Sequence, residues 1–272
     1  MSMDTHVILQ GDSPLVVSFP HSGLKLSEGL DECLTPQALG LPDTDWHVPQ
    51  LYDFLDEMGA SRIYAKYSRY VVDLNRDPSG VSLYPGQATT GLIPTDMFDG
   101  AAIYLNDQMP DKTEIEQRRV DFHAPYHQAL SEMLNETKAR HGYAILWDAH
   151  SIISHVPRLF DGALPDLNLG TNSGQSCAAS IEAVATKTLQ AHTAFKTITN
   201  GRFKGGWITR HYGQPDQHIH ALQMEIAQSA YMDESPPWAF DHTKAGPLRL
   251  ALQDIMQAAL DAARRLYKDQ TS

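Results

Sequence analysis

Residues 143–150 read YAILWDAH, an apolar run that ends on an aspartate and a histidine. Short apolar runs bounded by turn residues are typical of buried β-strands. Four more occur along the chain: LVVSFP at 15–20, ASRIYAKYS at 60–68, FKTITN at 195–200 and IHALQMEI at 219–226. We interpret all five as strands.

The segments around these strands carry apolar residues at helical spacing. They lie at 48–55, 115–134, 181–189 and 250–266, and we expect the last to form a C-terminal helix over about 247–267. Strands that alternate with helices predict an α/β fold with a largely parallel or mixed sheet. Residues 77–110 are rich in Gly, Pro, Asp and Thr, as in a long functional loop. No repeat or linker-like segment interrupts the chain, so we predict one domain over residues 1–272.

The composition excludes several classes of function. The chain has 272 residues, of which 42% are hydrophobic and 20% charged, as in a soluble globular protein. Its net charge of -12 disfavours a general affinity for nucleic acid or an anionic membrane. The N-terminal segment has no signal-like pattern, and no apolar run is long enough to span a membrane, so we expect a cytoplasmic protein that acts on a small molecule or a peptide. The oligomeric state stays open.

Histidines stand at the ends of two predicted strands. His21 follows the run LVVSFP, and His150 ends the run YAILWDAH with Asp148 two residues before it, on the same face of the strand. The carboxyl ends of strands face the ligand crevice in open α/β sheets. Two histidines and a carboxylate would form a three-ligand catalytic zinc site with a position open for water. The alternative is a structural role for each histidine.

The third ligand would come from the segment DTDWH at 43–47. Asp45 and His47 compete for this role. Aspartate and threonine are also favoured in the first turn of a helix, so a capping function is the alternative interpretation of this segment.

Two arginines and a glutamate complete the set of candidate catalytic residues. Arg69 and Arg76 flank an apolar segment, and Asn75 stands beside the second of them. The planar guanidinium suits a bidentate contact with a carboxylate or the stabilisation of an oxyanion. Glu225 interrupts an apolar run and is a candidate general base, unless it faces water at a sheet edge.

A glycine-rich basic segment at 201–213 contains Arg202, Lys204 and Arg210. It could close over an anionic substrate, or it could be a solvated loop. The chain has no phosphate-binding loop, no dinucleotide-binding glycine motif, no H-E-x-x-H and no G-x-S-x-G.

Eight motifs together resemble the N-formylglutamate amidohydrolase family. In chain order they are FPHSG, LPDTDWHV, YSRYVVDLNR, LYPGQ, ILWDAHSI, PRLFDGALPDLNLGT, GRFKGGWITRHYG and HALQMEI, and they span about residues 15–232. The resemblance implies a relation to zinc carboxypeptidases and aspartoacylase. It therefore implies a zinc-carboxypeptidase-like (phosphorylase/hydrolase-like) α/β fold, with a mixed sheet and helices on both faces.

The same resemblance implies one divalent metal ion, zinc above all, held by His21, an acidic residue and His150. Zinc carboxypeptidases place the acidic ligand three residues after the first histidine, where this chain has Leu24. We therefore assign Asp45, with His47 and Asp43 as alternatives. Iron, cobalt and manganese are further candidates, because a histidine and carboxylate site accepts several divalent ions.

The resemblance also implies the reaction and the role of each residue. N-formyl-L-glutamate would be hydrolysed to formate and L-glutamate, the last step of a histidine degradation route. Glu225 would be the general base for the metal-activated water, Arg69 would stabilise the oxyanion, and Asn75 with Arg76 would bind a substrate carboxylate. Alternatives are hydrolysis of another N-acyl amino acid or a peptide bond, and a non-catalytic protein that binds such compounds.

N-formylglutamate carries two carboxylates, so a second cationic contact is expected. We assign Arg76 to one carboxylate and Arg210, Arg202 or Lys204 to the other. The negative net charge does not oppose this, because the local charge of a cleft governs the capture of a small ligand.

Overall fold

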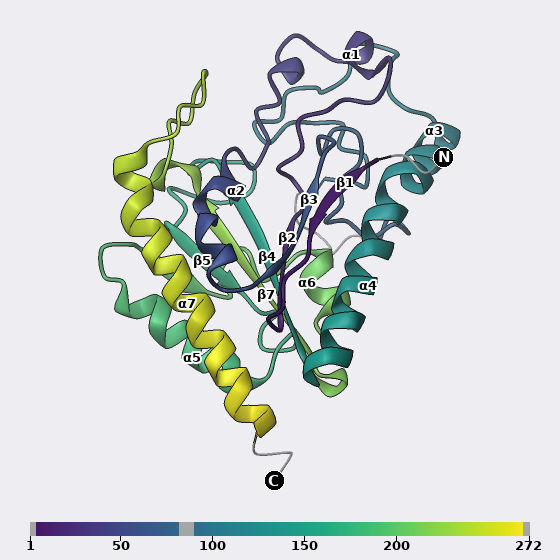
Figure 1. Cartoon of the computed structure of the whole chain (residues 1–272). Coiled ribbons are helices and arrows are strands. Elements are labelled where there is room, and N and C mark those ends of the chain that lie inside the picture. The colour runs from purple at the N-terminus through teal and green to yellow at the C-terminus, as the bar shows by residue number, and fades with distance from the viewer. Residues whose placement is uncertain (1–3, 82–89, 269–272) are drawn as a thin grey trace.

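A mixed sheet of seven strands runs through the middle of the molecule (Figure 1). The computed structural model describes residues 4–81 and 90–268. The strands are β1 (His6–Leu9), β2 (Leu15–Phe19), β3 (Ser61–Ala65), β4 (Ala144–Ile152), β5 (Leu167–Gly170), β6 (Thr197–Thr199) and β7 (Ile219–Ala227). Their order is β1-β3-β2-β4-β7-β5-β6. The central strands β3, β2, β4 and β7 are parallel, whereas β1 and β5 pair antiparallel with β3 and β7.

All five predicted strands are present, and the sequence missed two short ones. β1 and β5 have four residues each. Such runs carry too few residues to show a period. β6 covers only three residues of the predicted segment FKTITN, and β4 continues past His150 to Ile152.

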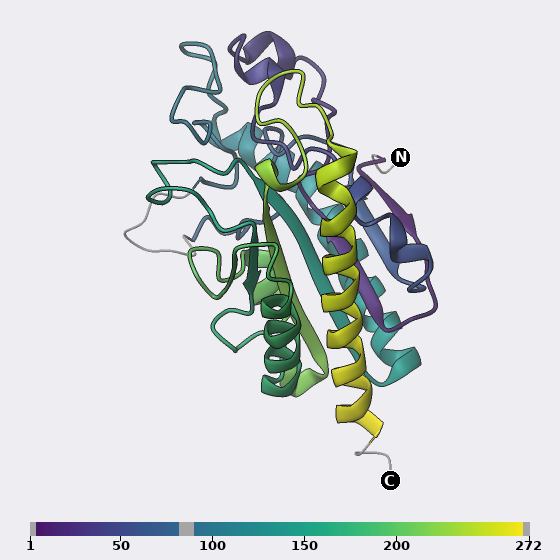
Figure 2. The ribbon, with the colours of Figure 1, turned by 90° about the vertical axis from the view of Figure 1, so that its left-hand side faces the viewer.

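Helices cover both faces of the sheet, as expected. They are α1 (Leu30–Cys33), α2 (Val48–Leu51), α3 (Lys112–Arg118), α4 (Ala124–His141), α5 (Ala179–Ala191), α6 (Trp207–Tyr212) and α7 (His242–Lys268). Helices α5 and α7 lie side by side on one face, and α4 and α6 lie on the other (Figures 1 and 2). Within the described ranges, no helix has the length and apolar character that crossing a membrane requires.

Two helical segments differ from the prediction. The run expected over 115–134 is divided into α3, a π-helical turn at Arg119–His123 and α4. Helix α7 begins at His242, five residues before the predicted start, and includes Pro247 in its second turn. At this position proline removes the N–H that would bond to the carbonyl of Thr243, four residues before it.

The long connections after β2 and β3 gather beyond the carboxyl ends of the central strands (Figure 1). Most described residues of the predicted 77–110 loop have no regular structure. The motif LYPGQ at 83–87 lies outside the described residues.

Strand β4 divides the core into two layers. Ile145, Trp147 and Ala149 pack in the cluster that contains α5 and α7, whereas Ala144 and Leu146 pack in the cluster that contains α4. All five side chains are buried. This alternation follows from the two-residue period of a strand that is covered on both faces.

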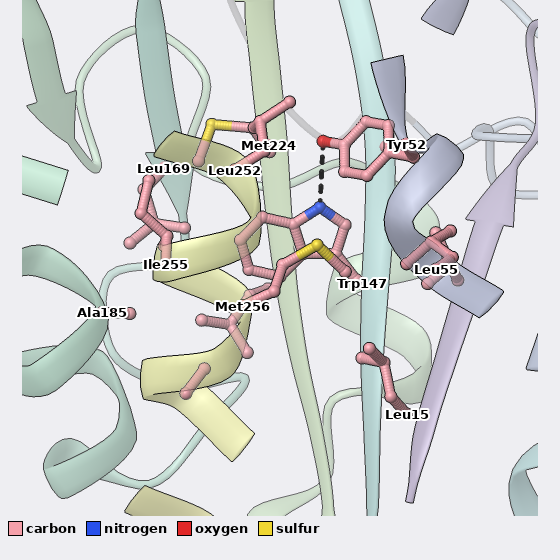
Figure 3. Packing of buried hydrophobic residues seen from close by; sticks show 14 of the residues in the cluster. Leu15, Tyr52, Leu55, Trp147, Leu169, Ala185, Met224, Leu252, Ile255 and Met256 are labelled. Atoms are coloured by element: carbon pink, nitrogen blue, oxygen red, sulfur yellow. Dashed lines mark hydrogen bonds between the residues drawn. The ribbon is translucent and has the colours of Figure 1, made fainter. Parts of the chain in front are cut away.

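The indole of Trp147 is the largest fully buried side chain of the core (Figure 3). Its Nε1–H donates a hydrogen bond of 3.1 Å to the hydroxyl of Tyr52. Tyr52 is itself 1% exposed, so water cannot replace this acceptor.

We expect Tyr52→Phe to lower the free energy of unfolding by about 1–3 kcal/mol, because it leaves the Trp147 N–H buried without an acceptor. Urea unfolding followed by tryptophan fluorescence measures this change as a lower midpoint at constant slope. Tyr143→Phe is the matched control, since the Tyr143 hydroxyl bonds to none of the described residues and its ring stacks on Tyr267. Equal stability of the two variants would contradict the expectation.

Candidate active site

Three candidate residues meet where the central strands end. His150 of β4 stands opposite Glu225 of β7 in the parallel register, and His21 follows the end of β2, which pairs with the other edge of β4. Adjacent parallel strands thus bring residues from distant parts of the sequence to one edge. These residues line a cavity of about 220 Å³. Pockets for drug-sized ligands measure about 300–1,000 Å³, so this one suits a smaller molecule.

His21, Asp45 and His150 form a buried group whose nearest ligand atoms all lie within 4.8 Å of one another. Asp45 Oδ2 lies 3.0 Å from His150 Nδ1 and 3.8 Å from His21 Nδ1. The Asp45 N–H also donates a hydrogen bond of 3.1 Å to the backbone carbonyl of His21. This bond fixes the 43–47 turn against the end of β2.

The two alternatives for the third ligand lie elsewhere. The carboxylate of Asp43 accepts hydrogen bonds from the Tyr70 hydroxyl and the Phe98 N–H, and burial raises its pKa to about 6. His47 Nε2 donates to the backbone carbonyl of Trp238, 2.8 Å away. The helix that follows begins after His47 without a side-chain cap, so the capping interpretation of this segment is wrong.

Each histidine of the group is supported by a second carboxylate on its other ring nitrogen. His21 Nε2 lies 2.7 Å from Asp73 Oδ1, and His150 Nε2 lies 3.1 Å from Asp148 Oδ2. This leaves both Nδ1 atoms turned toward Asp45. Carboxylates that orient histidines in this way are typical of metal sites. The predicted support of His150 by Asp148 is confirmed.

The charges around the group suit a cation. Burial opposes the charged form of His150, but Asp148 and Asp45 outweigh it and raise its pKa well above the ordinary value. Asp45 Oδ1 is buried and has no hydrogen-bond partner among the described residues. Two imidazole nitrogens and a carboxylate with an unused oxygen are the donor set of a catalytic zinc site. The group could therefore hold a metal ion.

Asp73 connects the group to the candidate substrate-binding residues, and sequence reasoning assigned it no role. Its Oδ1 accepts from His21 and from the Asn75 N–H, while its Oδ2 accepts from Arg69 Nη2 at 2.7 Å and lies 3.7 Å from Arg76 Nη1. Asp73 is fully buried, which raises its pKa, but Arg76 and Arg69 reverse this and hold the pKa well below the usual range. The sequence signal that could have indicated a role for Asp73 is its position as a carboxylate in an apolar segment between two arginines.

Asn75 is fixed between β4 and α6. Its Nδ2 lies 2.9 Å from His150 Nε2, and its Oδ1 accepts a hydrogen bond of 2.8 Å from the Ile208 N–H. A Cβ atom at Gly206 would stand 2.3 Å from the Asn75 amide nitrogen. Glycine is therefore required at 206 for this approach.

Glu225 is buried at the wall of the cavity. Burial raises its pKa to about 8, against the opposing effect of His150. Gln223 Nε2 donates to Glu225 Oε2 over 3.3 Å, and Gln223 Oε1 accepts from the Gly206 N–H. Glu225 does not face open water at a sheet edge, because β7 lies between β4 and β5. A buried carboxyl group with a raised pKa is suited to exchange protons.

The family model for N-formylglutamate amidohydrolase matches residues 13–232. The chain belongs to this family. It is 48% identical over 258 residues to a Pseudomonas aeruginosa protein named N-formylglutamate deformylase, covering 95% of this chain and 97% of the relative. A Pseudomonas putida protein of the same name is 47% identical over 263 residues, with the same coverage.

Solved structures share the fold. A crystal structure of N-formylglutamate amidohydrolase from Ralstonia eutropha JMP134 superposes with a TM-score of 0.77 at 23% identity, covering 98% of this chain and all of the other. An Agrobacterium tumefaciens gene product has a TM-score of 0.71 at 15% identity, covering 96% of both chains.

The predicted cations of this N-formylglutamate amidohydrolase family member take different positions. Arg69 is buried in the cavity wall with its guanidinium 4.7 Å from the centre of the Phe98 ring. Arg76 and Arg202 also line the cavity. Lys204 is exposed, and neither it nor Arg210 is among the described lining residues.

Arg158 lines the cavity as well, and sequence reasoning gave it no role although it stands in the motif PRLFDGALPDLNLGT. It follows β4 by six residues. The position of an arginine on an irregular loop depends on contacts between distant segments, which the motif does not reveal.

Two further buried histidines support the Asn75 segment in this family member. His127 Nε2 donates to the carbonyl of Leu74, and His123 Nε2 donates to the carbonyl of Arg76. His123 belongs to the π-helical turn, and burial lowers its pKa to about 4. Both act as neutral donors on either side of Asn75. π-helical turns are frequent at functional sites.

Proposed function

We propose that this protein hydrolyses N-formyl-L-glutamate to formate and L-glutamate. The observation that carries the proposal is the cavity in which a His–Asp–His group, a buried glutamate and four arginines come together. The names of the relatives at 47–48% identity support the same substrate. The cationic lining suits a small molecule with two carboxylates.

We assign His21, Asp45 and His150 as ligands of one divalent metal ion. Zinc fits this set of nitrogen and oxygen donors best. When bound, such an ion supplies Lewis-acid polarisation of the substrate carbonyl and lowers the pKa of water. Asp73 and Asp148, which lie against the Nε2 atoms, would leave both Nδ1 atoms to hold the ion.

Glu225 transfers the proton in this proposal. As water attacks the formyl carbon, the ionised Glu225 carboxylate accepts the proton that the water loses. The protonated carboxyl group then delivers this proton to the amine nitrogen of the leaving glutamate, and the C–N bond breaks. A pKa that burial raises to about 8 favours the proton-bearing form that the second step needs.

The arginines bind and stabilise negative charge. Arg69, fixed by Asp73, stabilises the charge that develops on the formyl oxygen. Asn75 and Arg76 bind one substrate carboxylate, with Arg76 anchored to Thr90 through Nε and Nη2. Of the three cations that the sequence offered for the second carboxylate, Arg202 is the one that lines the cavity. Arg210 and Lys204 are weaker candidates, because neither belongs to the described lining.

Three broader predictions accompany this assignment. The relation of the fold to zinc carboxypeptidases, the place of the reaction in histidine degradation and a cytoplasmic location follow from the family resemblance and the sequence. The mixed sheet with helices on both faces agrees with the first.

We expect Arg76→Ala to raise KM for N-formyl-L-glutamate by about 30-fold or more, because a desolvated charge contact is worth about 2–5 kcal/mol. Steady-state formate release over a range of substrate concentrations measures this. Metal content should stay that of the wild type. An unchanged KM would remove Arg76 from the substrate site.

The deciding experiment is metal analysis of the purified protein followed by formate release before and after chelation. We expect about one divalent ion per chain and release that chelation abolishes and zinc restores. Metal without formate release would redirect the assignment to other N-acyl substrates. Absence of both would favour a binding protein.

A further inference from the structure

Arg158 enters the cavity from the loop that follows β4. Its Nη1 donates a hydrogen bond of 3.1 Å to the Met97 carbonyl, and its Nη2 lies 3.3 Å from Asp96 Oδ2. These contacts orient the guanidinium against residues 96–98. Asp96 is about half exposed, and an ion pair that open to solvent contributes little energy and is readily exchanged for another anion.

A small apolar cluster fixes the loop that carries Arg158. Val156 and Leu164 are buried in this cluster with Phe98, and Leu159 packs on it. Arg202 Nε donates to the carbonyl of Leu159 over 2.7 Å, which joins the 201–213 segment to the loop that carries Arg158. The two arginines therefore reach the cavity from segments that support each other.

Residues 96–98 lie between Arg158 and Arg69 in the cavity wall. Arg158 contacts Asp96 and Met97 at one end, and Arg69 lies over the Phe98 ring at the other. The formyl carbon and the side-chain carboxyl carbon of an extended N-formylglutamate lie about 6 Å apart, from five bonds of ordinary length. Arg69 and Arg158 thus contact the two ends of one three-residue stretch of the wall, so the formyl group and the side-chain carboxylate of one substrate can be assigned to different ends of it.

We propose that Arg158 is a specificity-determining residue that binds the side-chain carboxylate and selects N-acyl amino acids with an acidic side chain. The proposal rests on the hydrolase function proposed above. The ion pairs of the cavity arginines support this assignment. Arg69 and Arg76 share the fully buried Asp73, so their positions are fixed beside the reacting group and the first carboxylate. Arg158 has an exposed partner that a substrate carboxylate can replace.

The test compares N-formyl-L-glutamate with N-formyl-L-glutamine, which has the same shape and a neutral side chain. We expect Arg158→Gln to lower kcat/KM for N-formyl-L-glutamate by about 30-fold or more and to change the value for N-formyl-L-glutamine less than about threefold. Arg158→Lys should recover part of the loss, since it keeps the charge without the planar fork. If Arg158→Gln lowers kcat/KM equally for both substrates, so that the ratio of the two values is unchanged, the assignment is overturned.

Arg265→Gln is the matched control, because Arg265 is exposed near the end of α7. Figure 1 shows that this end of the helix lies far from the carboxyl ends of the central strands. Arg265→Gln should keep the wild-type ratio of kcat/KM for N-formyl-L-glutamate to that for N-formyl-L-glutamine. If this variant lowers the ratio as much as Arg158→Gln does, the effect of Arg158→Gln is not local. Calorimetric binding of L-glutamate and L-glutamine separates this proposal from the reaction. If the wild-type protein releases no formate, the proposed function is refuted. If the wild type nevertheless binds L-glutamate more tightly than L-glutamine and Arg158→Gln abolishes that preference, the role of Arg158 is still supported. The same preference in both proteins would overturn it.

Discussion

Glu225→Gln should reduce kcat for formate release by about 10²–10⁴-fold, the contribution typical of a positioned general base. The amide has nearly the shape of the carboxylate but cannot accept the proton of the attacking water. Steady-state formate release at saturating substrate measures the loss. Metal content should not change, because Glu225 is not one of the three assigned ligands.

The pH profile gives a second readout of the same group. Only ionised Glu225 can accept the proton, so wild-type kcat/KM should rise with pH along an acid limb and level off above the pKa of the group. Burial places that pKa near 8 in the protein alone, and a bound cation moves it lower. Glu132→Gln, an exposed carboxylate on α4, should keep wild-type rate and profile. If Glu225→Gln keeps both the wild-type kcat/KM and the acid limb of its pH profile, Glu225 is not the general base.

Asp45→Ala should lower the affinity for the divalent ion by about 100-fold or more and remove activity with it. The side chain is 2% exposed, and its Oδ2 lies close to both Nδ1 atoms, so the variant loses the carboxylate of the three-residue group. Metal per chain after dialysis, measured by elemental analysis, tests this without reference to turnover. The magnitude exceeds the about 10–100-fold typical of losing a supporting residue.

Two variants decide between the candidates that the sequence left open. His47→Gln should keep the metal, because its Nε2 is directed at the Trp238 carbonyl and an amide can make the same bond. Asp43→Asn should also keep the metal but lower stability, since its carboxylate accepts from Tyr70 and Phe98. Metal lost in His47→Gln and kept in Asp45→Ala would reverse the assignment.

The sequence predicted the central part of the fold because the central strands are apolar and bounded by turn residues. Burial on both faces makes most positions of β2, β4 and β7 apolar. The short strands β1 and β5 give no such signal. The π-helical turn at Arg119–His123 was also unpredictable, because its residues continue the helical spacing.

Candidate ligands were predictable where a single segment determines the position of a residue. His21 follows the end of β2 and His150 lies two residues before the end of β4, and the order of parallel strands brings such ends together. Asp45 could not be separated from Asp43 and His47, because three polar residues within five positions differ only in the direction of their side chains. The backbone bond from Asp45 to His21 and the left-handed conformation of His47, with φ 59°, set those directions.

The sequence by itself therefore determined the central strands, the longer helices, the sheet class and the residues near the ends of the central strands. Those properties follow from local periodicity and from the amino acids that end a strand. Only the tertiary structure decided that Asp73 joins a histidine to two arginines, and that Arg158 shares a cavity with Glu225. These contacts connect segments far apart in the chain, and their geometry depends on how the loops pack beyond the sheet.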